Sequence, residues 1–356
     1  MIKIIKEKQI NKTQQDIFNF IRSQKRATNS SIKIYLEKEN IIISRITVVR
    51  NINFLLAKNL IKRRGKGRSV WYEENIKNKV LRYFDVNDYF KLEPDKRNVV
   101  FERFNFKIFE DLKNIFTNEE IKELKKLNDD YQQRNKNLSK SIIKKEFERL
   151  TIDLSWKSSQ IEGNTYSLID TEILIKENKE AVGHKKEEAI MILNHKKTFN
   201  YILEQKVYFK KITVKKIQEI HHLLVQGLGI SMDIRKGLVG IVGTKYRPLD
   251  NEFQIMEALE KMIEILNKQK EPLSKALIAL LLISYIQPFE DGNKRTSRML
   301  SNALLLAYNF CPLSFRSIDE SDYKKAMIIF YEQNSIVFLK KLFIEQFKFA
   351  TNNYFL

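Results

Sequence analysis

The chain is poor in the residues that break helices or cross-link chains. Its 356 residues include only 10 glycines, 5 prolines and one cysteine, Cys311. Few helix breakers among many Lys, Ile, Leu, Asn and Glu favour a mainly α fold with short connections. A single cysteine excludes an internal disulfide and fits a reducing compartment, where Cys311 is expected to be a small buried hydrophobe.

Long hydrophobic segments are also missing. The longest largely apolar run, 276–286, is too short to cross a bilayer, and the first ten residues lack the apolar core of a signal peptide. We therefore expect a globular protein with no membrane partner and a cytoplasmic location. The length allows two or three domains, which we place at 1–82, 83–140 and 141–356.

Histidine is scarce, and no histidine stands at metal-ligand spacing from a second ligand. The adjacent His221 and His222 must face different sides of a helix. We expect packing or surface roles for all four histidines, which are His184, His195, His221 and His222.

Acidic residues are scarce in the first quarter of the chain. Residues 1–82 contain 20 Lys and Arg against 6 Asp and Glu, an excess of 14 out of the total net charge of +20. A coding bias toward lysine would not explain the local lack of acids. Such a charge concentration is typical of a nucleic-acid-binding domain.

The same region shows three short helical patterns followed by a hairpin pattern. Helices are predicted over 14–24 and 31–39, and a third runs from an N-cap at Ser44 to about Lys58. The third helix has an apolar stripe consisting of Ile46, Val49, Ile52, Leu55 and Leu56. Two β-prone runs around Gly65-Lys66-Gly67 then predict a hairpin. This order resembles a winged helix-turn-helix domain.

That resemblance implies double-stranded DNA as a partner. The third helix would be the recognition helix and the basic hairpin would be the wing. The candidate DNA-binding residues are Arg45, Arg50, Asn51, Arg63, Arg64, Lys66 and Arg68. Docking of another protein is the alternative use of such a domain.

The segment 83–140 is interpreted as a helical connector without chemistry. Thr117 and Glu120 form a capping-box pattern that predicts the start of a short helix. A longer amphipathic helix is predicted over about 141–162, ending near Gly163. Ser158 and Glu162 lie four residues apart on one face. A carboxylate at a helix C-terminus is unfavourable alone, so Glu162 requires a cationic partner.

The segment QPFEDGNKRTSR, residues 287–298, follows a helix that is apolar almost all round. Pro288 ends that helix at Gln287, and helical periodicity resumes after Gly292. The amides of residues 292–294 would lie at the new helix N-terminus, with Arg295 and Arg298 on one face beside them. This arrangement suits a polyphosphate, and Asp291 is placed to hold a bridging Mg²⁺.

These residues carry a family resemblance. The segment resembles the Fic signature His-x-Phe-x-(Asp/Glu)-Gly-Asn-(Gly/Lys)-Arg-x-x-Arg at every position except the first, where Gln287 replaces histidine. Upstream, Ser158 and Glu162-Gly163 resemble the inhibitory motif of the family. The segment 237–248 resembles its β-hairpin flap. The similarity extends over about residues 100–350.

The resemblance implies a Fic-type helical domain that moves AMP from ATP to a Ser, Thr or Tyr hydroxyl of a target protein. Asp291 would bind Mg²⁺, and Glu162 would pair with Arg298 and block the γ-phosphate. Tyr246 and Arg247 on the flap would align the target. The nucleotide-binding residues would be Gly292, Asn293, Lys294, Arg295 and Arg298, and the catalytic positions Gln287, Asn293 and Arg295.

The departure at position 287 affects catalysis rather than binding. The family histidine is the general base, and a neutral amide has no basic site near physiological pH. Three explanations stay open: an engineered substitution that silences the enzyme, a natural residue in an ATP-responsive regulator, or weak activity through phosphate positioning alone.

Two functions therefore compete. The first is an adenylyltransferase autoinhibited through Glu162, and the second is a catalytically inactive, ATP-binding and DNA-binding transcriptional regulator. Another phosphate-transferring reaction is a third alternative, because Lys294 replaces the commoner glycine. A homodimer is one oligomeric state that we consider, and the sequence does not identify the target protein or the DNA site.

Overall fold

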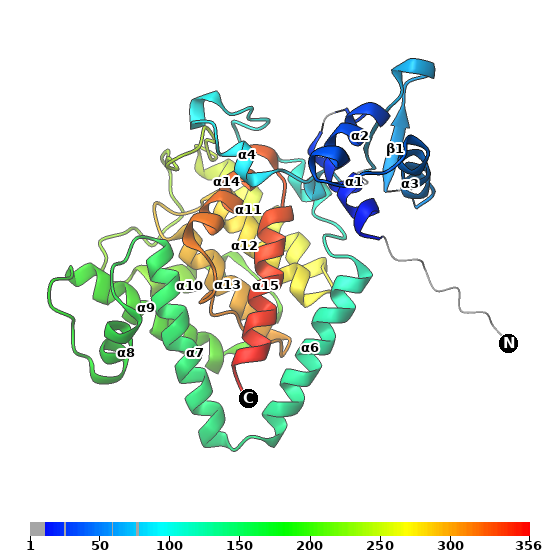
Figure 1. Cartoon of the computed structure of the whole chain (residues 1–356). Coiled ribbons are helices and arrows are strands. Elements are labelled where there is room, and N and C mark those ends of the chain that lie inside the picture. The colour runs from blue at the N-terminus through cyan, green and yellow to red at the C-terminus, as the bar shows by residue number, and fades with distance from the viewer. Residues whose placement is uncertain (1–10, 25, 59, 76–77) are drawn as a thin grey trace. The chain divides into compact units, whose positions relative to one another are not determined.

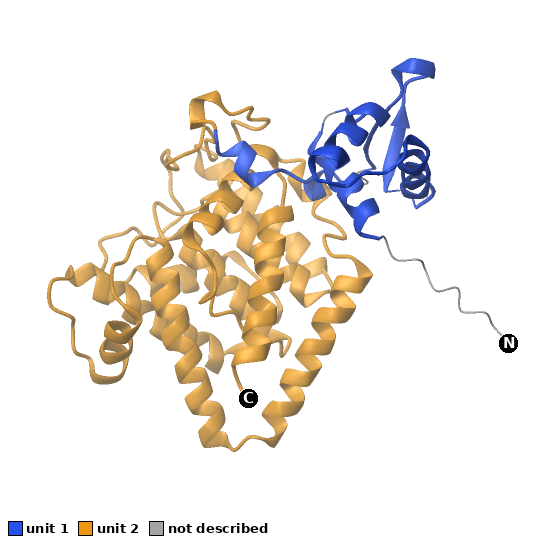
Figure 2. Ribbon diagram, viewed as in Figure 1, with its two compact units in different colours: residues 1–91 blue, residues 92–356 orange. Residues whose placement is uncertain are grey.

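The computed structural model describes residues 11–24, 26–58, 60–75 and 78–356. The chain divides into two compact units, residues 1–91 and 92–356 (Figure 2). The sequence places its boundaries at 82 and 140 instead, and the functional division there stays a prediction.

Unit 1 contains three helices followed by a β-hairpin. The helices are α1 (Lys12–Ser23), α2 (Asn29–Lys38) and α3 (Arg45–Ala57), and the strands β1 (Ile61–Arg64) and β2 (Trp71–Glu74) pair antiparallel (Figure 1). Each of the three helices begins at a side-chain cap, which is Asn11, Thr28 or Ser44. A short helix, α4 (Val86–Tyr89), follows.

The hairpin turn depends on one glycine. Gly65 has φ +77°, and a Cβ there would lie 2.3 Å from the Ser69 carbonyl oxygen. The cations of the hairpin, Lys62, Arg63, Arg64, Lys66 and Arg68, are all exposed.

The apolar stripe predicted for α3 is partly wrong. Ile46 is 74% exposed, whereas Val48 is buried with Ile52 and Leu55. The buried face also includes Asn51, whose side chain accepts a hydrogen bond from Gln14 of α1 at 3.1 Å. The buried face of α3 therefore follows residues 48, 52 and 55, and it is rotated about the helix axis away from the predicted stripe.

Unit 2 is helical in all of its described elements. Its α-helices are α5 (Ile108–Asp111), α6 (Asn118–Asn137), α7 (Lys140–Ile161), α8 (Leu168–Glu177), α9 (Lys186–Glu204), α10 (Val214–Val225), α11 (Glu252–Lys268), α12 (Pro272–Ile286), α13 (Asn293–Ala307), α14 (Glu320–Gln333) and α15 (Val337–Asn353). Short 3-10 helices in the two units are η1 (Gly67–Ser69), η2 (Lys79–Leu81), η3 (Pro94–Lys96) and η4 (Lys206–Lys210).

The pair α12–α13 forms the centre of unit 2 (Figure 1). Every residue of α12 after Pro272 is buried, as the apolar sequence predicts. Helices α7, α9 and α10 pack around α13. This central pair rigidly positions the loop 287–292 that joins its two helices.

Two predictions about elements of unit 2 need correction. Thr117 and Glu120 do form a capping box, but α6 is a 20-residue helix rather than a short one. It continues because Leu124, Asn128 and Tyr131 are buried at helical spacing.

The second correction concerns the segment 237–248, which contains no β-hairpin. The segment is extended with a turn at 242–243, and its only bridge to another described residue pairs Arg247 with Arg103. Other groups satisfy its backbone: Arg97 donates to the Gly243 carbonyl, and Glu332 accepts from the Lys245 amide. Strand pairing within the segment is therefore unnecessary.

Candidate functional site

The loop between α12 and α13 has a strained and closely packed backbone. Gln287 adopts a left-handed conformation with φ 52°, and its backbone N–H still donates to the Ile283 carbonyl. Gly292 begins α13 with φ 77°. A Cβ at Gly292 would lie 3.1 Å from Val225 and 3.2 Å from His221, so glycine fits best there.

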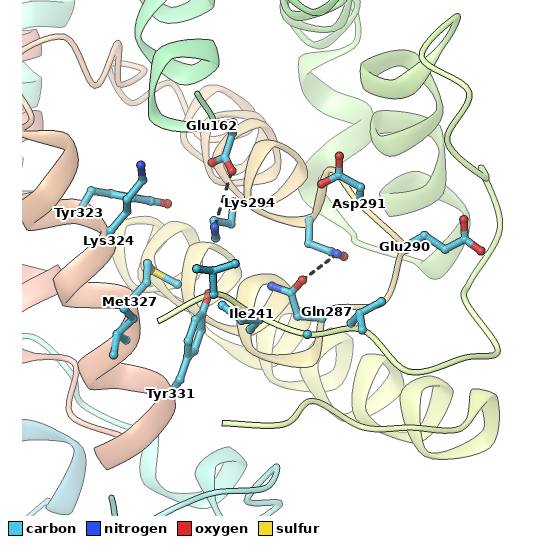
Figure 3. A pocket seen from close by; sticks show the side chains of 15 residues that line it. Glu162, Ile241, Gln287, Glu290, Asp291, Lys294, Tyr323, Lys324, Met327 and Tyr331 are labelled. Carbon is cyan, nitrogen blue, oxygen red and sulfur yellow. Dashed lines mark hydrogen bonds and ion pairs between the residues drawn. The ribbon is translucent and has the colours of Figure 1, made fainter. Parts of the chain in front are cut away.

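Side chains lock this loop from within. The ring of the buried Phe289 stacks on His221 with centroids 3.6 Å apart. Asn293 accepts from the Phe289 amide at 2.9 Å and donates to the Phe289 carbonyl at 2.8 Å. Asn293 also donates to Gln287 Oε1 at 2.9 Å, while Gln287 Nε2 donates to the Ser284 carbonyl at 2.7 Å (Figure 3). Both polar atoms of the Gln287 side-chain amide, Oε1 and Nε2, are therefore hydrogen-bonded.

The two arginines of α13 are buried and contact different carboxylates. Arg295 Nη2 lies 3.1 Å from Asp291 Oδ2, and its buried Nη1 has no hydrogen-bond partner among the described residues. Arg298 Nη2 donates to Glu162 Oε1 at 2.9 Å and to the Ser158 carbonyl at 2.9 Å. Arg298 Nε donates to Ser158 Oγ at 2.8 Å.

Glu162 has the cationic partner that its position requires. It caps the C-terminus of α7, just before Gly163, whose φ of 96° turns the chain away. Its second oxygen lies 3.7 Å from Lys294 Nζ (Figure 3). Burial acts to raise the pKa of Glu162, but Arg298 and Lys294 outweigh it and hold the pKa below its usual value. The carboxylate is therefore ionised at neutral pH.

A cavity of about 380 Å³ opens beside these groups. Its polar side includes Glu162, Gln287, Asp291, Asn293 and Lys294. Its apolar side comes from α14 and from the segment 237–248 (Figure 3): Tyr323, Met327, Ile328, Tyr331, Val239, Ile241 and Val242. A cavity with one polar and one apolar wall can hold a ligand with a charged part and a flat apolar part.

Asp291 is the candidate for the metal. Its side chain is 70% exposed and borders the cavity. In the described ranges, no group of three or more His, Cys, Asp or Glu side chains could hold a metal ion alone. Mg²⁺ is often held by a single protein carboxylate, with substrate phosphates and water as the remaining ligands of the ion.

The expectation that Tyr246 contacts a target does not hold. Tyr246 is only 2% exposed, donates to the Tyr285 carbonyl at 2.7 Å and stacks on Tyr285 and Tyr331. Burial raises its pKa well above the usual value. Tyr246 therefore anchors the segment 237–248 to Tyr285 and Tyr331, whereas Arg247 has an exposed side chain.

Arg235 is a residue of this site that sequence reasoning missed. Its side chain donates to the carbonyls of Gly237 at 2.5 Å, Leu249 at 2.6 Å and Gln287 at 2.6 Å. It is 2% exposed. Arg235 thereby connects both ends of the segment 237–249 to the loop 287–292. In the sequence, only its position directly before that segment indicates this role.

The candidate DNA-binding residues lie on α3 and the hairpin of unit 1, with one exception. Their arginines and lysine are exposed, and Arg64 pairs with Glu73 at 2.7 Å. Asn51 is 9% exposed and bonded to Gln14, so it does not belong to the exposed face.

Part of unit 2 matches a known family. Residues 211–305, which include the whole signature at 287–298, match the Fic/DOC family model. The match is limited to this part of unit 2.

Curated relatives carry the same name. The chain is 33% identical over 180 residues to "Protein adenylyltransferase Fic" from Nematostella vectensis, covering 47% of this chain and 40% of the relative. The protein of that name from Drosophila willistoni is 28% identical over 174 residues, covering 47% and 34%. The chain thus spans two fifths or less of the length of these relatives.

Solved structures share the fold. A Fic-1 fragment from C. elegans superposes with a TM-score of 0.55 at 18% identity, covering 66% of this chain and 69% of that chain. A Fic-domain-containing signalling protein from Bacteroides thetaiotaomicron gives 0.54 at 19% identity, covering 64% and 95%. No helix in the described part of the chain is long and apolar enough to cross a membrane.

Proposed function

We propose that unit 2 is a Fic-type adenylyltransferase domain that binds Mg²⁺ and ATP and is held inactive by Glu162. The observation that carries this proposal is the ion pairing of Glu162 with Arg298 and with Lys294, because Glu162 and Lys294 both line the cavity. Arg295 and Arg298 lie buried on the same helix, α13. Nη1 of Arg295 is buried and has no hydrogen-bond partner in the described part of the chain, which supports a phosphate ligand, because such a donor needs an acceptor.

In this reaction a target hydroxyl oxygen bonds to the α-phosphorus of ATP, the bond to the bridging oxygen breaks, and pyrophosphate leaves. Arg295 and Arg298 hold the β- and γ-phosphates, and the first amides of α13 face the developing charge. Asp291 would hold Mg²⁺, which would neutralise further charge on the phosphates. Gln287 offers no basic acceptor, so the hydroxyl proton passes to solvent water. We expect the transfer to be slower by about 10² to 10⁴-fold than with a histidine at this position.

The amide at position 287 also supports a second candidate function. Gln287 is bonded to Asn293 and Ser284 and stabilises the loop without offering a base. Together with the exposed cations of α3 and the hairpin, this favours a DNA-binding regulator whose Fic domain binds ATP without chemistry. In that case unit 1 is a winged helix-turn-helix domain.

One experiment separates the two functions. The chain, Gln287→His, Glu162→Gly and the double variant are incubated with ATP labelled on the α-phosphate, with and without a cell lysate. Label on a protein from the variants that carry histidine supports the transferase. ATP binding and duplex DNA binding, with no label from any variant, support the regulator. Parallel reactions with ATP labelled on the γ-phosphate detect a different phosphate transfer.

A further inference from the structure

Arg298 is hydrogen-bonded to a serine that does not border the cavity, and this serine in turn contacts a histidine that does not border it either. Ser158 Oγ accepts from Arg298 Nε at 2.8 Å. On the other side of the same oxygen, Nε2 of His195 on α9 lies 2.8 Å away. All three side chains are fully buried. His195, Ser158 and Arg298 therefore form a continuous buried row that ends at Glu162.

Elementary chemistry fixes the direction of these hydrogen bonds. Nδ1 of His195 lies 2.8 Å from the Met191 carbonyl oxygen, which can only accept, so Nδ1 carries a proton. Burial lowers the pKa of His195 to about 3, so the ring is neutral and Nε2 is an acceptor. The Ser158 hydroxyl must then donate to Nε2, which leaves its lone pairs for Arg298.

We infer that His195 is a positioning residue that orients the Ser158 hydroxyl and, through it, aims Arg298 at the phosphates of the nucleotide. This inference rests on the proposed function of Arg298. A serine hydroxyl without His195 is free to rotate and to offer its proton elsewhere, so the buried Nε of Arg298 loses a fixed acceptor. His195 thus has a role beyond the packing expected from the sequence.

The test compares ATP with AMP, which lacks the β- and γ-phosphates. Calorimetry with Mg²⁺ measures both affinities for the full chain carrying Glu162→Gly, alone and combined with His195→Phe. We expect His195→Phe to lower the ratio of ATP to AMP affinity about tenfold, with AMP affinity unchanged. His195→Gln restores most of the ratio, because its amide can accept from Ser158 and donate to Met191.

A mutant cycle and two controls make the test specific. Ser158→Ala should lower the ratio to the same extent, and His195→Phe should add nothing to it. Ser159→Ala removes only a weaker contact to His195 at 3.3 Å, and His184→Phe changes a histidine outside the row, so both should leave the ratio unchanged. An unchanged ratio in His195→Phe, or an additive effect with Ser158→Ala, overturns the inference.

Two further outcomes are decisive. If Glu162→Gly binds ATP no better than AMP, the proposed function fails and this inference fails with it. If His195→Phe does not fold, ¹⁵N-histidine NMR of the unsubstituted chain reports the tautomer, and only four histidines need assignment. A ring protonated at Nδ1 alone is expected, and a ring protonated at Nε2 overturns the inference.

Discussion

Glu162 Oε1 lies 2.9 Å from Nη2 of Arg298, a guanidinium with no exposed surface. Removing one partner from a buried ion pair is usually costly, because the other charge is left unpaired. Here Ser158 gives Arg298 two more acceptors, its hydroxyl and its carbonyl. The glutamate can therefore leave while the arginine stays in place, which is the behaviour required of a reversible block.

The first prediction concerns ATP affinity. Glu162→Gly should tighten Mg·ATP binding about tenfold or more, because phosphates replace a carboxylate as the partner of Arg298. The substitution suits its position, since glycine is tolerated at a helix C-terminus. Calorimetry measures the change. Glu148→Gln, at an exposed acid of the same helix, is the control for charge. Equal ATP affinities in the parent and Glu162→Gly contradict the proposed block.

The second prediction concerns pH and stability. The pKa of Glu162 lies below its usual 4.5, because Arg298 and Lys294 outweigh the opposing effect of burial. Its contribution to stability is therefore present above pH 4.5 and is lost as the pH falls through the folded-state pKa. We expect Glu162→Gln to lower the free energy of unfolding by about 1–3 kcal/mol near neutral pH, and the difference to shrink below 4.5.

Fluorescence can isolate this effect in unit 2. The chain has two tryptophans, Trp71 in unit 1 and Trp156 on α7. Urea unfolding in a Trp71→Phe background is followed through Trp156 at several pH values. A difference between the parent and Glu162→Gln that stays constant down to pH 3 would exclude an ionised, paired Glu162.

The third prediction concerns Arg235. Arg235→Met should speed hydrogen exchange in both 237–249 and 287–293, because one side chain serves carbonyls of both segments. Mass spectrometry of exchanged peptides measures this. Arg247→Met, at an exposed arginine of the same region, should leave 287–293 unchanged. Faster exchange in only one of the two segments would contradict the link.

Local signals in the sequence predicted the elements well. Ser44 and Thr117 cap their helices as expected, because a cap involves residues only three positions apart. The loop 287–292 was predicted for the same reason, since Pro288 and Gly292 act on their own backbone. The packed face of α3 could not be chosen this way: Asn51 is buried because Gln14, 37 positions away, provides its partner.

Residues that act at long range left no readable pattern. Arg235 reaches Gln287 across 52 positions, and His195 reaches Ser158 across 37. The β-hairpin expected over 237–248 was wrong for a similar reason. Its backbone groups bond to Arg97 and Glu332, which belong to distant parts of the chain.

The last prediction concerns the basic hairpin of unit 1. If it contacts duplex DNA, replacing the exposed Arg63 and Arg68 by serine should weaken binding and reduce the slope of log K against log salt by about 2, because each lost phosphate contact removes close to one released counterion. Fluorescence anisotropy with a labelled duplex at several salt concentrations measures the slope. The matched control replaces Lys144 and Lys179, two exposed cations of unit 2, by serine. If both pairs change the slope equally, the attraction is a property of the net charge, and the hairpin is not a wing that binds DNA.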